Sequence, residues 1–361
     1  MRRKKSKGLI LFSFVFLIFY IFLFPGLSEK ELHLKPVWVR DLDDGVGEGS
    51  EQVDFAFEMG GRFGYADLEG GIHYLDRVLF GVALAESGFI NFPRITDNFV
   101  FQNTLGGFEF SFESSGYPLL EGSGETLYMV TTDLSGIRQF TREWDLLWSY
   151  EFSTAITSVS LEGQRCLLGL LDGRAKLIES QGGITYEYSP EGSPDGGRIP
   201  VILATTLRGR QLALISGIDP QSLLLIEEKR GEFSYIHREI LESDFRRELI
   251  LQFTKDGRYL VFEQEGSVGL FDLARRKIHY ISLPGRLFSL SSSLGKLALS
   301  SIDGDLIHLK IIATPDRVIY SKTFGPSVEH HGSGRGLYLN LIANHLIIGQ
   351  SGALMRIDIN E

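Results

Sequence analysis

LLGLLDGRAKL at residues 167–177 and LALSSIDGDLIHL at residues 297–309 share one plan: an apolar run, a turn centred on glycine, and a second apolar run. A two-residue hairpin turn needs positive φ at its central positions, which Gly adopts freely and Asp tolerates. Asp172-Gly173 and Asp303-Gly304 are therefore predicted to join two β-strands. An enzymatic role for either Asp is disfavoured, because the turn itself explains the residue.

The same plan occurs eight times along the chain, with turn centres 29 to 48 residues apart. Dividing the residues after position 36 among eight units gives about 41 each, the length of a four-stranded propeller blade. Such a unit has room for two hairpins, of which we expect the repeated motif to form the inner one. The other six copies are FGYADLEGGIHY (63–74), FVFQNTLGGFEF (99–110), LYMVTTDLSGIRQF (127–140), LALISGIDPQSLLLI (212–226), LVFEQEGSVGLF (260–271) and LIIGQSGALMRI (346–357).

Three segments carry a family pattern. FTKDGRYLVFEQEGSVGLFDL at residues 253–273 resembles the repeat of WD-type propellers, with Phe271-Asp272 in place of Trp-Asp, and residues 290–311 form a weaker copy. WSYEFSTAITSVSLEGQRCLLGLLDGRAKLI at residues 148–178 instead resembles the quinoprotein-type (PQQ-like) blade.

The resemblance implies an all-β fold: a β-propeller of seven or eight blades, with eight preferred, over residues 37–361. It also implies that strands from the two chain ends pair to close the ring, which removes an aggregation-prone edge. VWVR at residues 37–40 is the candidate closing strand. Trp144 and Trp148 are expected to pack between blades.

The N-terminal residues predict a membrane anchor. Residues 1–7 contain five Lys and Arg, and residues 8–24 contain no charge. At ~1.5 Å per residue those 17 residues span roughly 25 Å as a helix, enough for a thin bilayer. We predict a cytoplasmic basic tail (1–7), an uncleaved transmembrane signal anchor (8–27), a tether (28–36) and the propeller domain (37–361). A cleaved signal peptide is the alternative.

The positive-inside rule then keeps the basic tail in the cytoplasm. It places the propeller on the periplasmic or extracellular side of a bacterial cell membrane. The formal charge is −10, and removing the five N-terminal cations leaves −15 for the remainder. An acidic surface repels phosphate backbones, so nucleic-acid binding is disfavoured. Cys166 is the single cysteine, which excludes an internal disulfide and a Cys₄ zinc site, and its apolar neighbours predict a core position.

No catalytic, metal-binding or cofactor-binding residues are predicted. The residues Glu329-His330-His331 lie in a glycine-rich stretch interpreted as a solvated loop, and the acids of residues 41–45 lack the register of a calcium loop. The sequence has no G-x-S-x-G element. It also lacks the cluster of calcium ligands and stacking Trp that would hold pyrroloquinoline quinone.

The leading functional prediction is a non-catalytic, membrane-anchored scaffold that binds protein partners through loops held by rigid blades. The resemblance implies that the glycine turns gather on one face, so Glu69, Asp172 and Asp303 are predicted to give that face a negative ring. The alternative is an enzyme or small-ligand sensor that uses the central channel. A third hypothesis is a role in envelope assembly, as in quinoprotein-type propellers that serve outer-membrane protein insertion.

Overall fold

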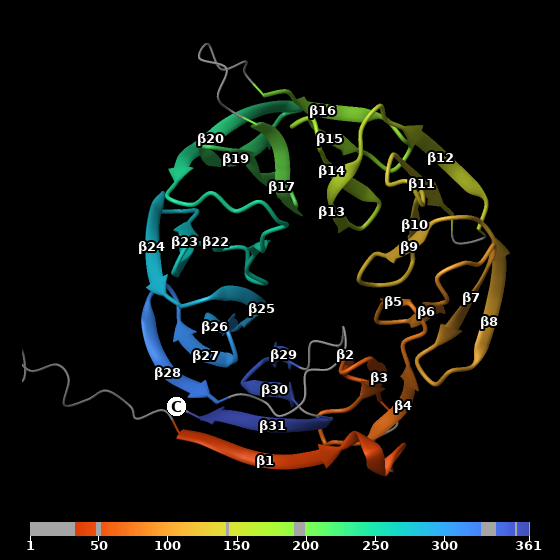
Figure 1. The fold of residues 1–361 in the computed structure, drawn as a ribbon, viewed down its shortest axis with the longest axis vertical. Coiled ribbons are helices and arrows are strands. Elements are labelled where there is room, and N and C mark those ends of the chain that lie inside the picture. The colour runs from red at the N-terminus through yellow and green to blue at the C-terminus, as the bar shows by residue number, and fades with distance from the viewer. Residues whose placement is uncertain are drawn as a thin grey trace, which may run out of the picture.

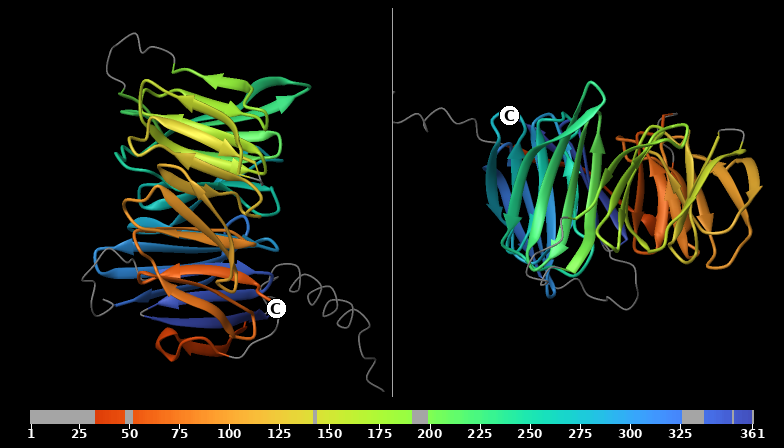
Figure 2. Two further views of the ribbon diagram at one scale, coloured as in Figure 1. Left: turned by 90° about the vertical axis from the view of Figure 1, so that its right-hand side faces the viewer. Right: turned by 90° about the horizontal axis from the view of Figure 1, so that it is seen from above.

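The computed structural model describes residues 33–47, 52–141, 144–190, 199–325, 337–350 and 352–360. Their strands form eight antiparallel sheets arranged around a central axis (Figure 1). Seen from the side, the ring is a disc (Figure 2). The predicted all-β propeller and the preferred number of eight blades are confirmed.

We number the blades along the chain, beginning with the sheet of β2. Blade 1 contains β2 (Phe55–Met59), β3 (Arg62–Ala66) and β4 (Ile72–Arg77); blade 2 contains β5 (Gly81–Leu84), β6 (Gly88–Phe92), β7 (Asn98–Asn103) and β8 (Phe108–Glu113). Blade 3 contains β9 (Tyr117–Leu120), β10 (Leu127–Val130), β11 (Gly136–Phe140) and β12 (Leu146–Glu151); blade 4 contains β13 (Ile156–Glu162), β14 (Arg165–Leu170), β15 (Ala175–Ile178) and β16 (Ile184–Tyr188).

The other half of the ring is built in the same way. Blade 5 contains β17 (Ile199–Arg208), β18 (Gln211–Ile218), β19 (Gln221–Lys229) and β20 (Glu232–Leu241); blade 6 contains β21 (Leu251–Phe253), β22 (Tyr259–Gln264), β23 (Ser267–Asp272) and β24 (Lys277–Ser282). Blade 7 contains β25 (Arg286–Ser293), β26 (Lys296–Asp303), β27 (Leu306–Ala313) and β28 (Arg317–Phe324); blade 8 contains β29 (Leu337–Ile342), β30 (His345–Gln350), β31 (Ala353–Asn360) and β1 (His33–Asp41).

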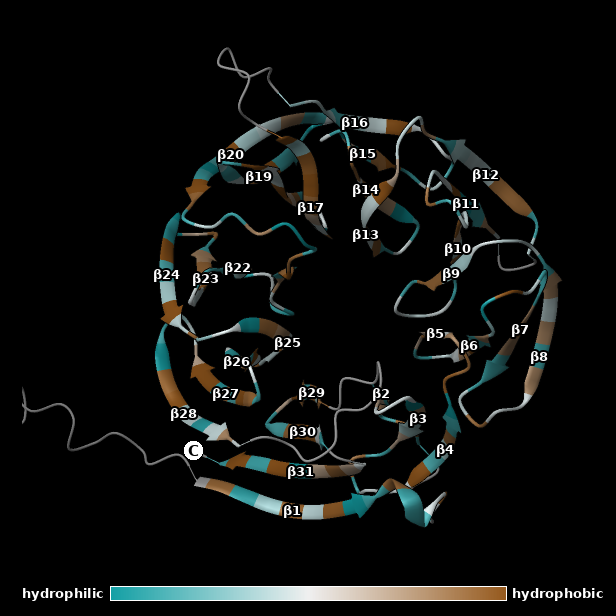
Figure 3. Cartoon of the chain, in the orientation of Figure 1, coloured by the Kyte–Doolittle hydropathy of each residue, from teal (hydrophilic) through white to brown (hydrophobic). Residues whose placement is uncertain are grey.

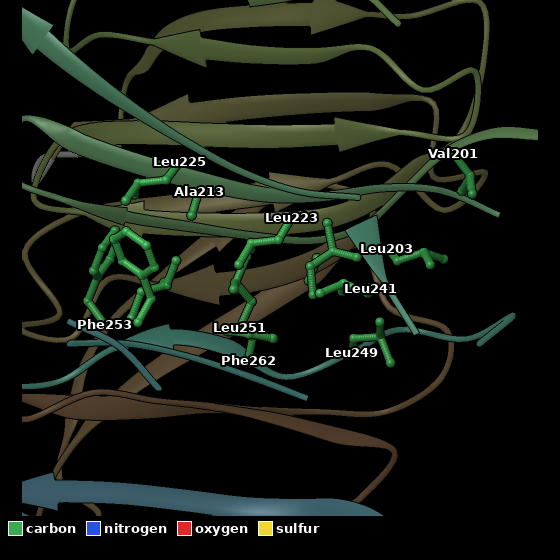
Figure 4. Packing of buried hydrophobic residues seen from close by; sticks show 14 of the residues in the cluster. Val201, Leu203, Ala213, Leu223, Leu225, Leu241, Leu249, Leu251, Phe253 and Phe262 are labelled. Carbon is green, nitrogen blue, oxygen red and sulfur yellow. The ribbon is translucent and has the colours of Figure 1, made fainter. Parts of the chain in front are cut away.

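The hydrophobic core lies between neighbouring blades. Second strands such as β14 and β18 are buried along nearly their whole length, because both of their faces meet another sheet. Figure 4 shows one such layer, in which Leu223 and Leu225 of blade 5 meet Leu251 and Phe253 of blade 6. The outermost strands alternate in hydropathy because one face is solvated (Figure 3). Cys166 is fully buried, as predicted.

The ring closes through blade 8, whose outermost strand comes from the N-terminal end of the described chain. β1 pairs antiparallel with β31, from His33 opposite Asn360 to Asp41 opposite Ala353. The predicted closing strand, residues 37–40, therefore lies in β1 and its role is confirmed. β1 begins at His33, so residues 33–36 belong to the strand and not to the predicted tether, because they continue the same register.

The predicted basic tail (1–7), anchor (8–27) and the first part of the tether lie outside the described residues. Over the residues that the structure describes, no helix combines the length and the apolar character needed to cross a bilayer.

Blade 1 has three strands among the described residues, and they correspond to the second, third and fourth strands of the other blades. Only residues 78–80 separate the end of β4 from the start of β5, so these two ends lie on the same face of the disc. In the regular blades it is the fourth strand that ends beside the first strand of the next blade. The turn between β3 and β4 is therefore a third-to-fourth-strand turn.

A glycine–aromatic contact repeated between blades supports this assignment. Gly70, in the turn between β3 and β4, has φ +92° and lies against the indole of Trp38 in the outermost strand of the preceding blade, where an added Cβ would come within 2.9 Å of the ring. Gly182, in the third-to-fourth-strand turn of blade 4, has φ +80° and meets Trp148 of blade 3 in the same way. Trp144 of blade 3 stacks on Phe110 of blade 2, with ring centroids 3.9 Å apart. Both predictions of tryptophans packed between blades are confirmed.

Antiparallel order distributes the turns over two faces of the disc. We call the face with the first-to-second-strand and third-to-fourth-strand turns face A, and the face with the second-to-third-strand turns and blade-to-blade connections face B. Six of the eight repeated glycine turns join second and third strands, and those centred on Gly71 and Gly107 join third and fourth strands. The expectation that the motif forms the inner hairpin is wrong, because the buried second and third strands are the ones that carry the longest apolar runs.

Ring closure yields the first prediction. Trp38 donates a hydrogen bond from Nε1 to the Leu68 carbonyl (2.8 Å) and covers Gly70, whereas its neighbour Val39 is 61% exposed. Trp38→Ala should lower the free energy of unfolding by about 2–4 kcal/mol, because it removes a large half-buried side chain. Val39→Ala should change it by no more than about 0.5 kcal/mol. Urea denaturation checks both, and equal losses would contradict the assigned contact.

The same blade predicts an acid-sensitive contribution to stability. Burial acts to raise the pKa of the Asp358 carboxyl, but hydrogen bonds from Arg356 and His345 outweigh it and hold the pKa below the usual 3.8. Because the folded-state pKa is depressed, this stabilisation is present above the unfolded-state pKa near 4 and is lost as pH falls through the folded-state value. The urea midpoint of Asp358→Asn should lie below that of the wild type at pH 6, and the difference should shrink by about pH 3. A difference independent of pH would contradict this reading.

Candidate protein-binding face

The three residues predicted to form one acidic ring do not lie on one face. Asp172 and Asp303 lie in second-to-third-strand turns of blades 4 and 7, on face B. Glu69 lies in the turn between β3 and β4, on face A. The single-face prediction is wrong, because the repeated motif of blade 1, like that of blade 2, joins the third and fourth strands and therefore turns on the opposite side.

The two remaining acids also differ in their surroundings. The Asp172 carboxylate pairs with the Arg174 guanidinium (2.6 Å), and although burial opposes it, hydrogen bonding to Arg174 keeps the pKa of Asp172 below its usual value. Asp303 is exposed, as is its neighbour Asp305. Asp172 therefore carries a largely compensated charge, and Asp303 carries a free one among the described residues.

Face B is nevertheless acidic, through residues that the sequence reasoning did not single out. Second-to-third-strand turns of blades 2, 3, 5, 6 and 7 each carry an exposed acid: Asp97, Asp133, Asp219, Glu265 and Asp305. Hydrogen bonds from Thr131 and Ser135 lower the pKa of Asp133 to about 2, so its charge persists in mild acid. The same turns of blades 2 to 7 carry one exposed cation among the described residues, Arg94, and Asp219 pairs with Arg246 (3.6 Å).

Exposed apolar side chains occur in turns on both faces, with Leu105 and Leu294 on face A (64% and 67% exposed), and on face B they lie on successive blades. Ile95, Leu134 and Leu171 lie in the second-to-third-strand turns of blades 2, 3 and 4 and are 89%, 42% and 53% exposed. The connection before blade 2 adds Leu79 and Phe80, and the start of β17 in blade 5 adds Ile199, all exposed. We call these six residues the apolar row. Single exposed apolar residues are ordinary, but a run of them over adjacent blades is typical of a binding surface.

Leu134 carries a second signal. Its backbone has φ +61°, a region that costs a non-glycine residue roughly 1–2 kcal/mol. The residue is held there by two backbone hydrogen bonds, from its N–H to the Thr131 carbonyl and from the Ile156 N–H to its own carbonyl (2.7 Å). A glycine would satisfy the same bonds without strain. Leu294, in the first-to-second-strand turn of blade 7 on face A, shares this combination of positive φ (+47°) and exposure (67%).

The first strands of the blades contain few charged residues. The described first strands, β5, β9, β13, β17, β21, β25 and β29, contain three charged residues: Glu162, Arg208 and Arg286, each at a strand end. Glu162 is occupied by the Gly209 N–H (2.7 Å). Among the described residues, no three His, Cys, Asp or Glu side chains are grouped to hold a metal ion. The Glu329-His330-His331 cluster lies outside the part of the chain that the structure describes.

One cavity of about 450 Å³ lies on face A between blades 1 and 2, lined by residues 52–56, Tyr65, residues 84–86 and Gly122. Its polar groups are largely engaged, since the Tyr65 hydroxyl donates to the Ala85 and Gly88 carbonyls and Asp54 accepts from the Leu68 N–H. Glu86 also lines the cavity, so two carboxylates, those of Asp54 and Glu86, border it.

Comparison with known proteins agrees with the architecture. A family model described as "beta-propeller protein" matches residues 1–340. The chain belongs to this β-propeller family. An uncharacterised protein of Treponema pallidum (strain Nichols) is 23% identical over 299 residues, covering 79% of this chain and 78% of its own length.

Two solved structures share the fold of this propeller. BamB from Moraxella catarrhalis has a TM-score of 0.61 at 16% identity and covers 90% of this chain and 100% of its own. The computationally designed Ika8 protein has a TM-score of 0.61 at 13% identity and covers 85% of this chain and 95% of its own. The PQQ-like resemblance inferred from residues 148–178 is thus supported at the level of fold.

The strain at Leu134 predicts an unusual combination of effects. Leu134→Gly should leave the melting temperature unchanged or raise it slightly, because relief of the left-handed strain offsets the added chain entropy of glycine. Leu168→Gly, at a fully buried position of β14, should lower it by more than 10 °C or prevent folding. Calorimetry on both variants decides the point, and a marked loss of stability in Leu134→Gly would assign the side chain to the core.

Proposed function

We propose that the protein is a membrane-anchored, extracytoplasmic scaffold that binds a protein partner through face B and catalyses no reaction. The observation that carries the proposal is the apolar row on successive blades, with its strained, exposed Leu134. The supporting context is the acid at the tips of neighbouring turns, which supplies the polar rim that surrounds the apolar centre of many interfaces. The uncharged segment at residues 8–24 supports the anchor.

The alternative, an enzyme or small-ligand sensor in the central channel, is less well supported. It requires carboxylates, His or Arg converging on the axis from several blades, whereas the described first strands carry charge only at their ends. Envelope assembly is the finer version of the scaffold proposal that the PQQ-like resemblance implies, and the likeness to BamB, being one of fold, leaves it as a proposal.

The partner should be captured from the native membrane. The full-length, tagged chain is crosslinked in its own envelope, purified, and its companions identified by mass spectrometry. Ile95→Ser/Leu134→Gly/Leu171→Ser should reduce capture at least tenfold, because central apolar side chains contribute about 1 kcal/mol or more each to an interface. The matched variant Leu146→Ser/Tyr280→Ser/Val318→Ser removes exposed apolar residues from outermost strands and should retain capture. Equal capture by both variants, or a co-purified metabolite with no protein partner, would overturn the proposal.

Charge reversal separates the two faces. Asp303→Lys should lower capture several-fold, mainly by slowing association, because it changes the field of face B. Glu69→Lys is the internal control, since Glu69 is equally acidic and exposed but lies on face A. The measurement is the association rate of the purified partner with each variant at two salt concentrations. Equal slowing by both variants would show that binding does not depend on the face.

A further inference from the structure

Face A has a basic sector in an otherwise acidic protein. Its first-to-second-strand and third-to-fourth-strand turns in blades 5, 6 and 7 place nine exposed cations on one side of the disc, against three exposed acids in the same turns, Glu232, Asp256 and Asp316. We call these nine residues the basic sector: Arg210, Lys229, Arg230, Lys255, Arg258, Arg275, Arg276, Lys277 and Arg317.

Two of the three acids within these turns are themselves engaged. Asp256 accepts hydrogen bonds from the Thr254 hydroxyl (2.6 Å) and the Arg258 N–H, and Asp316 pairs with His279 (2.9 Å). Within the basic sector, Lys229 pairs with Glu227 and Arg275 lies 3.9 Å from Asp272. The other seven cations make no ion pair with a described residue, so the sector keeps a net positive field.

The opposite half of the same face has the reverse sign. Turns of face A in blades 2, 3 and 4 carry Glu86, Glu121, Glu125, Asp145 and Glu179 and, among the described residues, no exposed Lys or Arg. The cations are therefore concentrated over three adjacent blades and are not spread evenly over an exposed surface.

The basic sector borders the blade through which the chain enters the propeller. β31 starts after the turn at Gly352 on face B and runs toward face A, so its antiparallel partner β1 begins on face A at His33. Figure 2 shows the C-terminal end of β31 at this face. Residues 25–32 separate the uncharged run from β1, a distance of at most about 30 Å when fully extended.

We propose that the basic sector of face A docks on the surface of a bilayer that contains anionic phospholipid; the inference rests on the membrane anchor of the proposed function. An anchor joined by a short connector to β1 brings face A to the headgroups, and clustered cations near an anionic surface are attracted to it within a Debye length. Docking orients the disc with blades 5 to 8 on the bilayer and face B, with its apolar row, directed away from it.

The test measures how close each face lies to the lipid headgroups. The full-length chain is reconstituted in nanodiscs of phosphatidylcholine, with or without about one third phosphatidylglycerol. A donor dye is attached at Glu232→Cys on face A or at Asp305→Cys on face B, and the acceptor dye is on the headgroups. Cys166 is fully buried and does not compete for the dye.

Energy transfer from the face A reporter should exceed that from the face B reporter, should rise when phosphatidylglycerol is present, and should fall at about 0.5 M salt. Arg275→Gln/Arg276→Gln/Lys277→Gln should shift the docking equilibrium about a hundredfold toward the undocked state, as expected for the loss of three cations near such a surface. Arg94→Gln/Arg246→Gln/Lys322→Gln removes three exposed cations that lie off face A and should leave the docking equilibrium unchanged.

Energy transfer that is indifferent to phosphatidylglycerol, or equal in the two triple variants, would overturn the proposal. A chain that fails to enter the nanodiscs at all would instead overturn the anchor. In that case cosedimentation of the same chain with vesicles of the two compositions decides the inference separately, with binding to phosphatidylglycerol supporting it and its absence overturning it.

Discussion

The pairing of β1 with β31 is the constraint on which the rest of the molecule depends. Each blade buries its apolar second and third strands only because a neighbouring blade covers each of its two faces. Without closure of the ring, the first and the last blade would each have one uncovered face. Closure is reinforced from the neighbouring blade, where the Leu68 carbonyl accepts hydrogen bonds from both Trp38 and Arg356. The last blade and the first are thereby joined by the same few polar contacts.

Two classes of turn determine which apolar and charged side chains lie on each face of the disc. Second-to-third-strand turns bring apolar side chains and acids to face B, and the remaining turns bring cations to one sector of face A. Because antiparallel strands alternate strictly in direction, moving a residue between these turn classes moves it across the full thickness of the disc. The asymmetry of the two faces therefore follows from which turns carry which residues, with the blade framework held constant.

The architecture was predictable because each blade is marked by a local sequence pattern. An apolar run, a turn glycine and a second run can be recognised without knowing their neighbours, and eight copies implied eight blades.

The faces were not predictable in the same way. Glu69 follows the same local pattern as Asp303, yet lies on the other side, because the motifs of blades 1 and 2 fall on the third and fourth strands instead of the second and third. The D/N/E-x-x-G-G signature at residues 67–71, 103–107 and 179–183 marks third-to-fourth-strand turns and could have revealed the shift. The grouping of Ile95, Leu134 and Leu171 depends on the lateral order of blades, which appears only once the ring is assembled.

The use of strands from both ends in blade 8 also sets an order of events during synthesis. Residues 33–41 leave the ribosome before every other strand of the propeller, yet their pairing partner at residues 353–360 is made last. Until then seven blades present an open arc with two uncovered lateral surfaces, and non-local pairing of this kind is slow. A product truncated shortly before residue 353 would keep most of its blades and still leave the arc open, which makes it a substrate for proteases.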